Sequence, residues 1–356
     1  MMVGDIAGRL DRETAQLRAR MTSLARQIAT GQRAEAPGDI APQLPRALAL
    51  RAEIGRRDAY GEAIGQAQQR AAAQQTVLKR LTDLGREFAE EVAMKLDPDR
   101  PEAVGPAARR ARDALTEVGQ LLNTRHAGEY LFGGSDFANP PLPQGDSLAS
   151  GPLAQRIATA VGTLGSAGAA TVAGETLAAA KDEDAAVTPF SAFHSGTGAG
   201  TQEARRAIPA EDGVLVPYGL FPNRNAATVS DGETTGSWAR DLIRGLASLA
   251  ALTPAQAQGA REEFRAFVAT VRDGLRSATA ALGGESGALG QTEARLAATA
   301  TRHDEVQTAL RGQLAGIEEV DLAETLSRMQ QTQTALQASY GAIARMGQLS
   351  LAQFLR

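Results

Sequence analysis

The chain lacks cysteine, has few aromatic residues and contains no long apolar run. None of its 356 residues is Cys, and 4% are aromatic. Without cysteine, disulfides, thiolate metal sites and a cysteine nucleophile are excluded. No apolar run approaches the ~20 residues with which a helix spans a bilayer. Charged residues such as Asp5, Arg9 and Asp11 interrupt the N-terminal segment, so we expect no cleaved signal peptide.

Residues that carry catalytic chemistry are sparse as well. The three histidines, His126, His194 and His303, stand far apart without metal-binding spacing, and each is interpreted as a surface or structural residue. The glycine pair at 133–134 is not followed by the lysine of a phosphate-binding loop. A net charge of −4 gives no reason to expect nucleic-acid binding. We therefore predict no enzymatic activity, no cofactor and no metal site.

What the sequence does contain is a narrow apolar stripe at each end. In the first 30 residues, apolar side chains recur at spacings near three and four, which predicts a coiled-coil helix ending near Gly31. The last part of the chain shows a heptad stripe of the same kind. These stripes are the predicted assembly seam: Ile6, Leu10, Leu17, Leu24 and Ile28 near the start, and Leu322, Leu326, Met329, Leu336, Tyr340 and Ile343 near the end.

A lone helix with so narrow a stripe leaves its seam in water and is marginally stable. The two terminal helices are therefore expected to pair with each other as a coiled coil. Long helices between them would run antiparallel and form an elongated shaft, from which copies of the chain assemble.

Three further long helical segments are predicted between the two ends. One runs from about residue 44 to 94, which is roughly 75 Å, and the next from about 106 to 130. Helix resumes near Ser237, and the glycines at 283, 284 and 287 are expected to break it. The stretch 292–356 is nearly free of helix breakers.

Residues 136–236 differ from the rest of the chain. They are rich in Gly, Pro, Ser and Thr, and their acidic residues outnumber the basic ones. This composition predicts an inserted, β-rich and loop-rich domain that faces solvent, although the piece 157–181 is also compatible with helix. The fold class is thus mainly α with an inserted β-rich domain. Its parts are a terminal coiled-coil assembly region (1–43 and 315–356), a helical shaft (44–135 and 237–314) and the insertion (136–236).

Several motifs carry a resemblance to a known family. Residues 130–134 read YLFGG, and residues 28–31 (IATG) with 37–39 (PGD) are similar to a turn motif. Near the C-terminus, 326–331 read LSRMQQ and 336–340 read LQASY. Together they resemble the hook-associated protein 3 family, the hook–filament junction proteins of the flagellin superfamily. The motif, with its suggested role as a hinge into the outer domain, consists of Tyr130, Leu131, Phe132, Gly133 and Gly134.

This resemblance implies a structural protein of the bacterial flagellum. It would connect the hook, through hook-associated protein 1, to the flagellin filament, and would contact further copies of itself. It would lie outside the cell after type III export without a cleaved signal peptide, and an export chaperone would cover its C-terminal helix. No nucleic-acid or membrane partner is expected.

Two alternatives remain open from the sequence. The chain could be a flagellin-type filament subunit, which has the same fold but another place in the polymer. It could also be a cytosolic coiled-coil adaptor, although an insertion between two long helical arms fits a simple rod poorly. Secretion into the medium separates these readings, since an adaptor stays inside the cell.

Overall fold

Helices dominate the structure. A computed structural model describes the backbone of residues 2–34 and 37–354, and the side chains of residues 8–34 and 38–345. Helix accounts for 71% of it, and the strands of the described residues form two small antiparallel sheets of two strands each. The mainly α fold class predicted from the sequence is confirmed.

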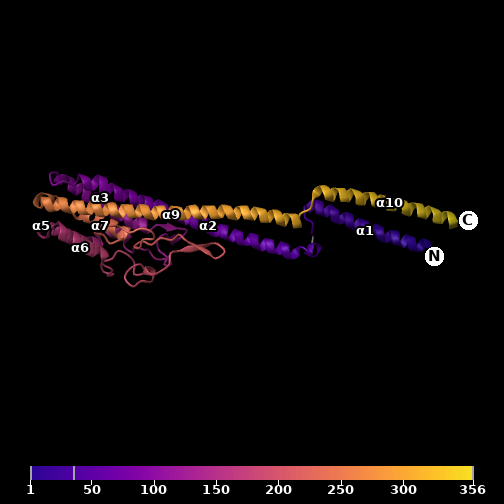
Figure 1. Ribbon diagram of the computed structural model, residues 1–356, viewed down its shortest axis with the longest axis horizontal. Helices are drawn as coiled ribbons and strands as arrows, with labels where there is room; N and C mark the ends of the chain where they lie inside the picture. The colour runs from indigo at the N-terminus through magenta and orange to yellow at the C-terminus, as the bar shows by residue number, and fades with distance from the viewer. Residues whose placement is uncertain (1, 35–36, 355–356) are drawn as a thin grey trace. The chain divides into compact units, whose positions relative to one another are not determined.

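The elements can be followed along the chain in Figure 1. The α-helices are α1 (Met2–Thr30), α2 (Leu44–Arg86), α3 (Val104–Leu122), α4 (Pro152–Gly162), α5 (Leu164–Ala167), α6 (Ala169–Lys181), α7 (Trp238–Ala251), α8 (Pro254–Gly259), α9 (Arg261–Glu318) and α10 (Leu322–Phe354). The strands are β1 (Arg125–His126) and β2 (Glu129–Tyr130) in one sheet, and β3 (Ala207–Glu211) and β4 (Val214–Pro217) in the other.

The chain divides into two compact units. One combines Met1–Ala59 with Arg302–Arg356, and the other is Tyr60–Thr301. Helices α2 and α9 contribute residues to both units. The finer division into terminal region, shaft and insertion stays a prediction.

In the first unit, α1 and α10 pair in antiparallel fashion, as Figure 1 shows. A bridge between Gln32 and Glu319 lies at one end of the pair, and a hydrogen bond between Arg18 and Tyr340 lies further along. The expected pairing of the two terminal helices is therefore present. In the same unit α2, α9 and the 3-10 turn Pro37–Ile40 share a small apolar core, which consists of Ile40, Ala47, Leu50 and Ile317.

The second unit is built around α7. Every residue from Trp238 to Ala250 is buried, because α3, α4 and α6 pack against this helix. Two buried arginines on α7 are satisfied by backbone carbonyls. Arg240 donates to the oxygen of Ala180 at 2.8 Å, and Arg244 donates to that of Ala173 at 2.9 Å. Because α6 supplies both acceptors, these arginines fix α6 against the core.

The predicted helix end near residue 94 agrees with the structure, and the one near residue 130 needs correction. α2 begins at Leu44 as expected, and after Arg86 the helical backbone continues as a π-helical turn over Glu87–Val92 and a 3-10 turn over Ala93–Lys95. α3 stops at Leu122 rather than near 130. The side chain of Asn123 bonds both the N–H and the carbonyl of Leu142, at 3.0 and 2.7 Å, and so diverts the chain into the β1–β2 hairpin.

The predicted break at the glycines 283–287 is wrong, because α9 runs through them without interruption. Glycine in a helix interior costs about 1 kcal/mol relative to alanine, but packing offsets that cost here. A side chain at Gly284 would collide with Thr228, whose hydroxyl donates to the carbonyl oxygen of Ala281 at 2.7 Å. Gly284 thus lies where the segment around Thr228 packs closely on α9, and not at the end of a helix.

The break in the last helical stretch instead falls between α9 and α10. The carboxylate of Asp321 accepts hydrogen bonds from the backbone N–H groups of Ala323 and Glu324 at 2.9 and 3.1 Å. This N-cap starts a new helix. The N–H of Val320 donates to the oxygen of Gly31 at 3.0 Å, so the joint is tied to the end of α1.

The insertion contains less β structure than expected. Residues 152–181 form α4, α5 and α6, so the helical alternative for 157–181 is the correct one. Its strands are β3 and β4, joined by a turn in which Gly213 has φ +72°. One face of this hairpin packs on α2 and α9, where Val216 and Tyr218 share a core with Ile64 and Leu296. Alanine favours helix, and the prediction of β structure gave too much weight to the Gly and Ser content of the whole insertion.

Among the described residues, none of the helices combines the length and the apolar character that crossing a membrane requires.

Candidate assembly surface

The seam between α1 and α10 is partly apolar and partly hydroxylic. On α10, Thr325, Thr332 and Leu336 are buried. On α1, Thr14 and Leu24 are buried. The threonine hydroxyls bond to carbonyls of their own helix, and so bring no unpaired donor into the seam. Such a seam buries less apolar surface than an all-leucine one, so the pair is held by a modest free energy.

The predicted seam residues fall into three groups. Leu24 and Leu336 are buried, and the others that face into the pair are partly buried: Leu10, Leu17, Ile28, Met329 and Ile343. Leu322, Leu326 and Tyr340 are exposed, at 51%, 44% and 42%. The side chain of Ile6 lies outside the described residues. The role of all these residues in assembly stays a prediction.

The three exposed residues form what we call the outer stripe of α10: Leu322, Leu326 and Tyr340. At 3.6 residues per turn they lie along one edge of the helix, beside the seam. The Nε of Arg18 on α1 donates to the Tyr340 hydroxyl at 2.6 Å, which fixes the phenol at the edge of the pair. The guanidinium of Arg18 also lies over the ring of Tyr340, 5.3 Å from its centroid. The outer stripe is therefore ordered apolar surface that the described chain leaves about half exposed.

The prediction missed Thr14, Thr325 and Thr332 because they are not apolar. A heptad count that admits threonine would have found them, since Thr325 and Thr332 lie seven residues apart and Leu336 follows at the next inward position. Threonine is short and β-branched, and fills a seam position while its hydroxyl turns back to the helix.

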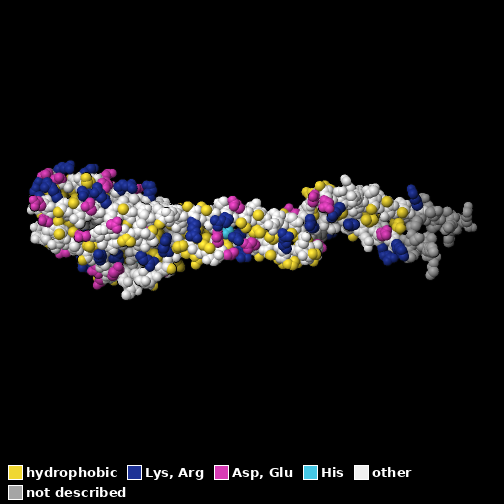
Figure 2. Space-filling model, viewed as in Figure 1, with side chains coloured by type: hydrophobic (Ala, Val, Ile, Leu, Met, Phe, Trp, Pro, Cys, Tyr) yellow, Lys and Arg dark blue, Asp and Glu magenta, His cyan; other side chains and the backbone are white. Residues whose placement is uncertain are grey.

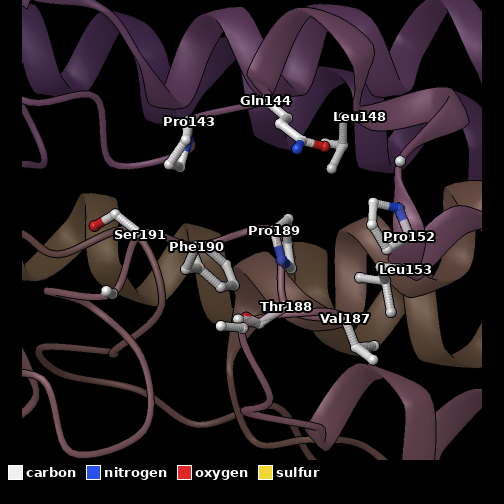
Figure 3. Close-up of a pocket in the computed structure, with 13 residues that line it drawn as sticks. Pro143, Gln144, Leu148, Pro152, Leu153, Val187, Thr188, Pro189, Phe190 and Ser191 are labelled. Carbon is white, nitrogen blue, oxygen red and sulfur yellow. The ribbon is translucent and has the colours of Figure 1, made fainter.

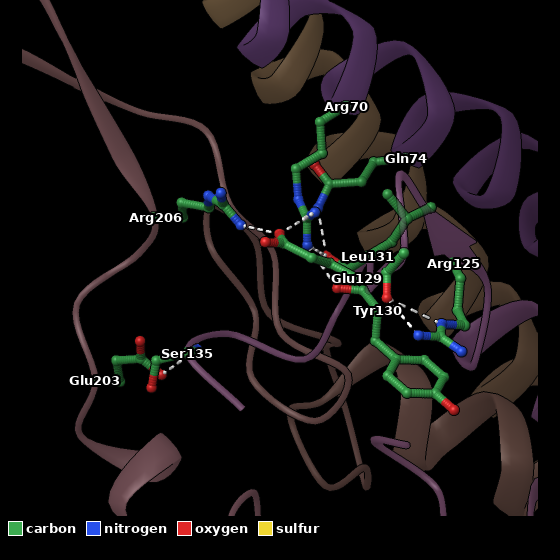
Figure 4. A network of polar contacts seen from close by, with 10 residues as sticks. Arg70, Gln74, Arg125, Glu129, Tyr130, Leu131, Ser135, Glu203 and Arg206 are labelled. Carbon is green, nitrogen blue, oxygen red and sulfur yellow. Dashed lines mark hydrogen bonds and ion pairs between the residues drawn. The ribbon is translucent and has the colours of Figure 1, made fainter. Parts of the chain in front are cut away.

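The YLFGG segment is tied to α2. Leu131 and Phe132 are buried at 1% and 0% exposure. Arg70 donates to the carbonyl oxygens of Tyr130 and Leu131 at 2.5 and 3.2 Å, and Gln74 also bonds Leu131 at 3.0 Å (Figure 4). Buried carbonyls must find donors, and here two α2 side chains supply them.

Glu129, just before this segment, links it to the insertion. Its carboxylate pairs with Arg206 at 2.5 Å and with Arg70 at 3.2 Å (Figure 4). The hydrogen bond from Arg206 holds the pKa of Glu129 below its usual value, and the charge of Arg70 adds to this. One carboxylate thus joins α2 to the strand region of the insertion.

The two glycines of the motif are required by close packing. A Cβ at Gly133 would lie 2.8 Å from the carbonyl oxygen of Asp136. Gly134 has φ +61°, and a Cβ there would lie 2.6 Å from the carboxylate of Glu203 and 2.8 Å from the ring of Phe221. The role of the segment as a hinge stays a prediction, since its backbone is held by α2 on one side and by Glu203 on the other.

His194 is buried behind this segment. Its ring lies between those of Phe193 and Phe221, with centroids at 4.9 and 6.1 Å. Burial lowers the pKa of His194 to about 4, although the carboxylates of Asp136 and Glu203 oppose the shift. The side chain is therefore neutral at physiological pH and acts as a packing residue, as the structural interpretation of the histidines predicts.

One cavity of about 180 Å³ opens in the insertion (Figure 3). Phe190 and the prolines 143, 152 and 189 line it, together with Leu148 and Leu153. No Asp, Glu, His, Lys or Arg lines it. The hydroxyls of Thr188 and Ser191 also line it, but no acid or base stands beside them in the lining to activate them.

No group of three or more His, Asp or Glu residues with the geometry of a metal site occurs within the described part of the chain.

Comparison with known proteins locates the resemblance at the C-terminus. Residues 273–355 match the model of the bacterial flagellin C-terminal helical region. That stretch covers α9 from Asp273 onwards and the whole of α10, and so includes the outer stripe. No curated protein sequence matches the chain. The chain thus carries, in its last part, a region similar to the C-terminal helical region of bacterial flagellin.

Proposed function

We propose that the protein is the flagellar subunit that joins the hook to the filament, similar to hook-associated protein 3. The flagellin-type region supports a structural role in the flagellum. The finer assignment is supported by the YLFGG segment, which is not part of the matched region and is built into the core of the Tyr60–Thr301 unit.

The observation that carries this proposal is the outer stripe. Leu322, Leu326 and Tyr340 are exposed large side chains on the helix that matches flagellin. Full burial of one such side chain contributes about 1.5–3 kcal/mol, and each is already about half covered, so a neighbouring subunit that covers all three gains on the order of 2–4 kcal/mol. The outer stripe forms the surface through which copies assemble, and the seam holds α10 on α1 so that this surface is presented.

The partners follow from this role. Hook-associated protein 1 lies on the hook side, flagellin on the filament side, and further copies of the chain lie in the same layer. Export follows the flagellar type III route, and an export chaperone shields the C-terminal helix until assembly. An exposed apolar stripe on a protein in transit needs such a cover, because it is a site of aggregation.

A flagellin-type filament subunit is the second candidate. It is favoured by the match itself, which is to the flagellin C-terminal region. The two functions share the outer stripe and differ in where the subunit sits and in how many copies are used.

The test is deletion of the gene in its host, followed by complementation and immunogold electron microscopy. A junction subunit leaves hooks without filaments and flagellin shed into the medium, and gold labels one point at the hook end of each restored filament. A filament subunit gives label along the filament and no shed flagellin. Normal filaments in the deletion strain, with the protein retained inside the cell, would refute both and favour the adaptor.

Two variants place the function on the outer stripe. Leu326→Asp removes the apolar surface at an exposed position and should fail to restore filaments. Gln331→Asp introduces the same charge at an exposed position on the opposite side of α10 and should restore them. Equal rescue by both variants would show that the stripe is not the assembly surface.

A further inference from the structure

A groove in the Tyr60–Thr301 unit lies between α3, α4, the end of α7 and the start of α8. Its volume is about 460 Å³, within the roughly 300–1,000 Å³ typical of sites that take a ligand. Alanines line most of it, among them Ala108, Ala154, Ala158 and Ala247. Side chains this small let the backbone of a bound segment approach closely, as they do between packed helices.

Two arginines on one side of α3 line this groove, and no acidic residue does. Arg109 and Arg112 are three residues apart and so lie on the same side of the helix. Arg112 donates one hydrogen bond, at 3.1 Å, to the carbonyl oxygen of Ala250 near the end of α7. Arg109 has neither a hydrogen bond nor an ion pair within the described residues.

A third arginine on α3, Arg110, has an acidic partner. It forms an ion pair with Glu87, so its charge is already matched within the unit. Figure 2 shows basic side chains gathered over the end of this unit where α3 lies, with acidic side chains between some of them. Within α3, Arg109 and Arg112 are thus the arginines for which the described residues provide no ion pair with a carboxylate.

We propose that this groove binds an acidic helical segment of a partner protein. The segment would present two carboxylates one helical turn apart to Arg109 and Arg112, and side chains of alanine size to the floor. Guanidinium and carboxylate groups form paired, charge-assisted hydrogen bonds, and carboxylates three or four residues apart on a helix match arginines spaced in the same way. The apolar floor favours a peptide over a free phosphate, which would leave the alanines uncovered.

The site is independent of the outer stripe, and none of its residues falls in the region that matches flagellin. It can therefore be tested without reference to filament assembly.

The test is a fluorescence anisotropy titration of the full chain. The probe is a labelled, alanine-based helical peptide with two glutamates one turn apart, and its glutamine counterpart is the control ligand. We expect the glutamate peptide to bind, and added salt to weaken the binding because the contacts are charged. The Arg109→Ala, Arg112→Ala double variant and the glutamine peptide should each lose at least about tenfold in affinity.

Two single variants separate charge from shape. Arg110→Ala removes an equal charge from the same helix outside the groove and should bind as the wild type does. Ala158→Leu fills the groove at an exposed position of α4 without touching either arginine, and should also weaken binding. Circular dichroism confirms that each variant is folded.

Each of three binding results would overturn the proposal: equal affinity for the two peptides, equal affinity of the double variant and the wild type, or no binding at millimolar protein. Sedimentation velocity gives one further result that would overturn it. Self-association of the chain that Ala158→Leu abolishes would show that a second copy, and not an acidic partner, occupies the groove.

Discussion

Glu285 and Thr228 join the middle of α9 to the last part of the insertion. The carboxylate of Glu285 accepts a hydrogen bond from the backbone N–H of Thr228 at 2.9 Å. The same oxygen accepts from the N–H groups of Ala226 and Ala227 at 2.9 and 2.8 Å. Three successive N–H groups thus converge on one buried carboxylate oxygen, an arrangement that resembles a backbone nest.

Glu285→Ala should therefore destabilise the Tyr60–Thr301 unit. The substitution leaves three backbone donors without their acceptor, and an unsatisfied buried donor costs about 1–3 kcal/mol. Since water reaches part of the opened loop, we expect a loss of about 2–4 kcal/mol in the free energy of unfolding. Urea denaturation followed by circular dichroism measures it.

The control for this prediction is Glu305→Ala, which removes an exposed glutamate from the same helix. Its effect should stay within about 0.5 kcal/mol. Similar losses for the two variants would mean that the nest around Glu285 contributes nothing specific.

The stability of the same unit should depend on pH through His194. The pKa of its buried ring is about 4, below the value of 6.5 that applies to the unfolded chain. The contribution of neutral His194 to the free energy of unfolding is therefore fully present above pH 6.5. It is lost as the pH falls from 6.5 towards 4, because only the unfolded chain binds the proton in that range. A shift of this size corresponds to about 3 kcal/mol.

Denaturation of wild type and His194→Gln across that pH range measures this effect. The difference between the two proteins should shrink as the pH falls. Asp241→Asn is the control with the opposite sign. Burial raises the pKa of Asp241, so the wild type should gain stability relative to this variant in acid. A pH-independent difference between wild type and His194→Gln would contradict the assignment.

Gly134→Ala should destabilise the protein by about 2 kcal/mol or more, because φ +61° alone costs about 1–2 kcal/mol for a residue with a Cβ. The new Cβ also meets Glu203 and Phe221. Gly174→Ala is the matched control, since that position lies in the interior of α6 with open space around it. There the same substitution should be neutral or stabilise by up to about 1 kcal/mol. Thermal denaturation of both variants decides the matter.

How far the sequence predicts this structure depends on whether a feature is local. The pairing of α1 with α10 follows from apolar periodicity, which any single segment reveals. Apolar periodicity does not predict which face of α10 turns towards α1. By that criterion Leu322 and Leu326 would face inward, but Thr325 does so instead. The burial of Thr325 and exposure of Leu326 at 44% reflect the packing of two particular helices.

Features that join distant segments escape sequence reasoning for a different reason. The glycines at 283, 284 and 287 predict a helix break because glycine is a poor helix former, whereas in the structure Gly284 and Glu285 contact the insertion. Their partners at 226–228 are brought to them by the fold, and no local rule connects the two segments. The same is true of Arg70, whose acceptors in the YLFGG segment lie some 60 positions away along the chain.

Substitution of the seam separates the internal helix pair from the assembly surface. Leu336 is 7% exposed between α10 and α1, whereas Leu326 is 44% exposed beside the seam. A charge at position 336 must be buried without a partner, so Leu336→Asp should cost on the order of 3 kcal/mol and release α1 from α10. Far-ultraviolet circular dichroism should then report less helix, and trypsin should cut within α1 and α10 faster than in the wild type.

Leu326→Asp should leave both readouts unchanged in the isolated chain and act only on assembly. Equal sensitivity of the two variants to trypsin would mean that the seam at Leu336 does not hold the terminal helices together, and that their order depends on neighbouring subunits in the polymer.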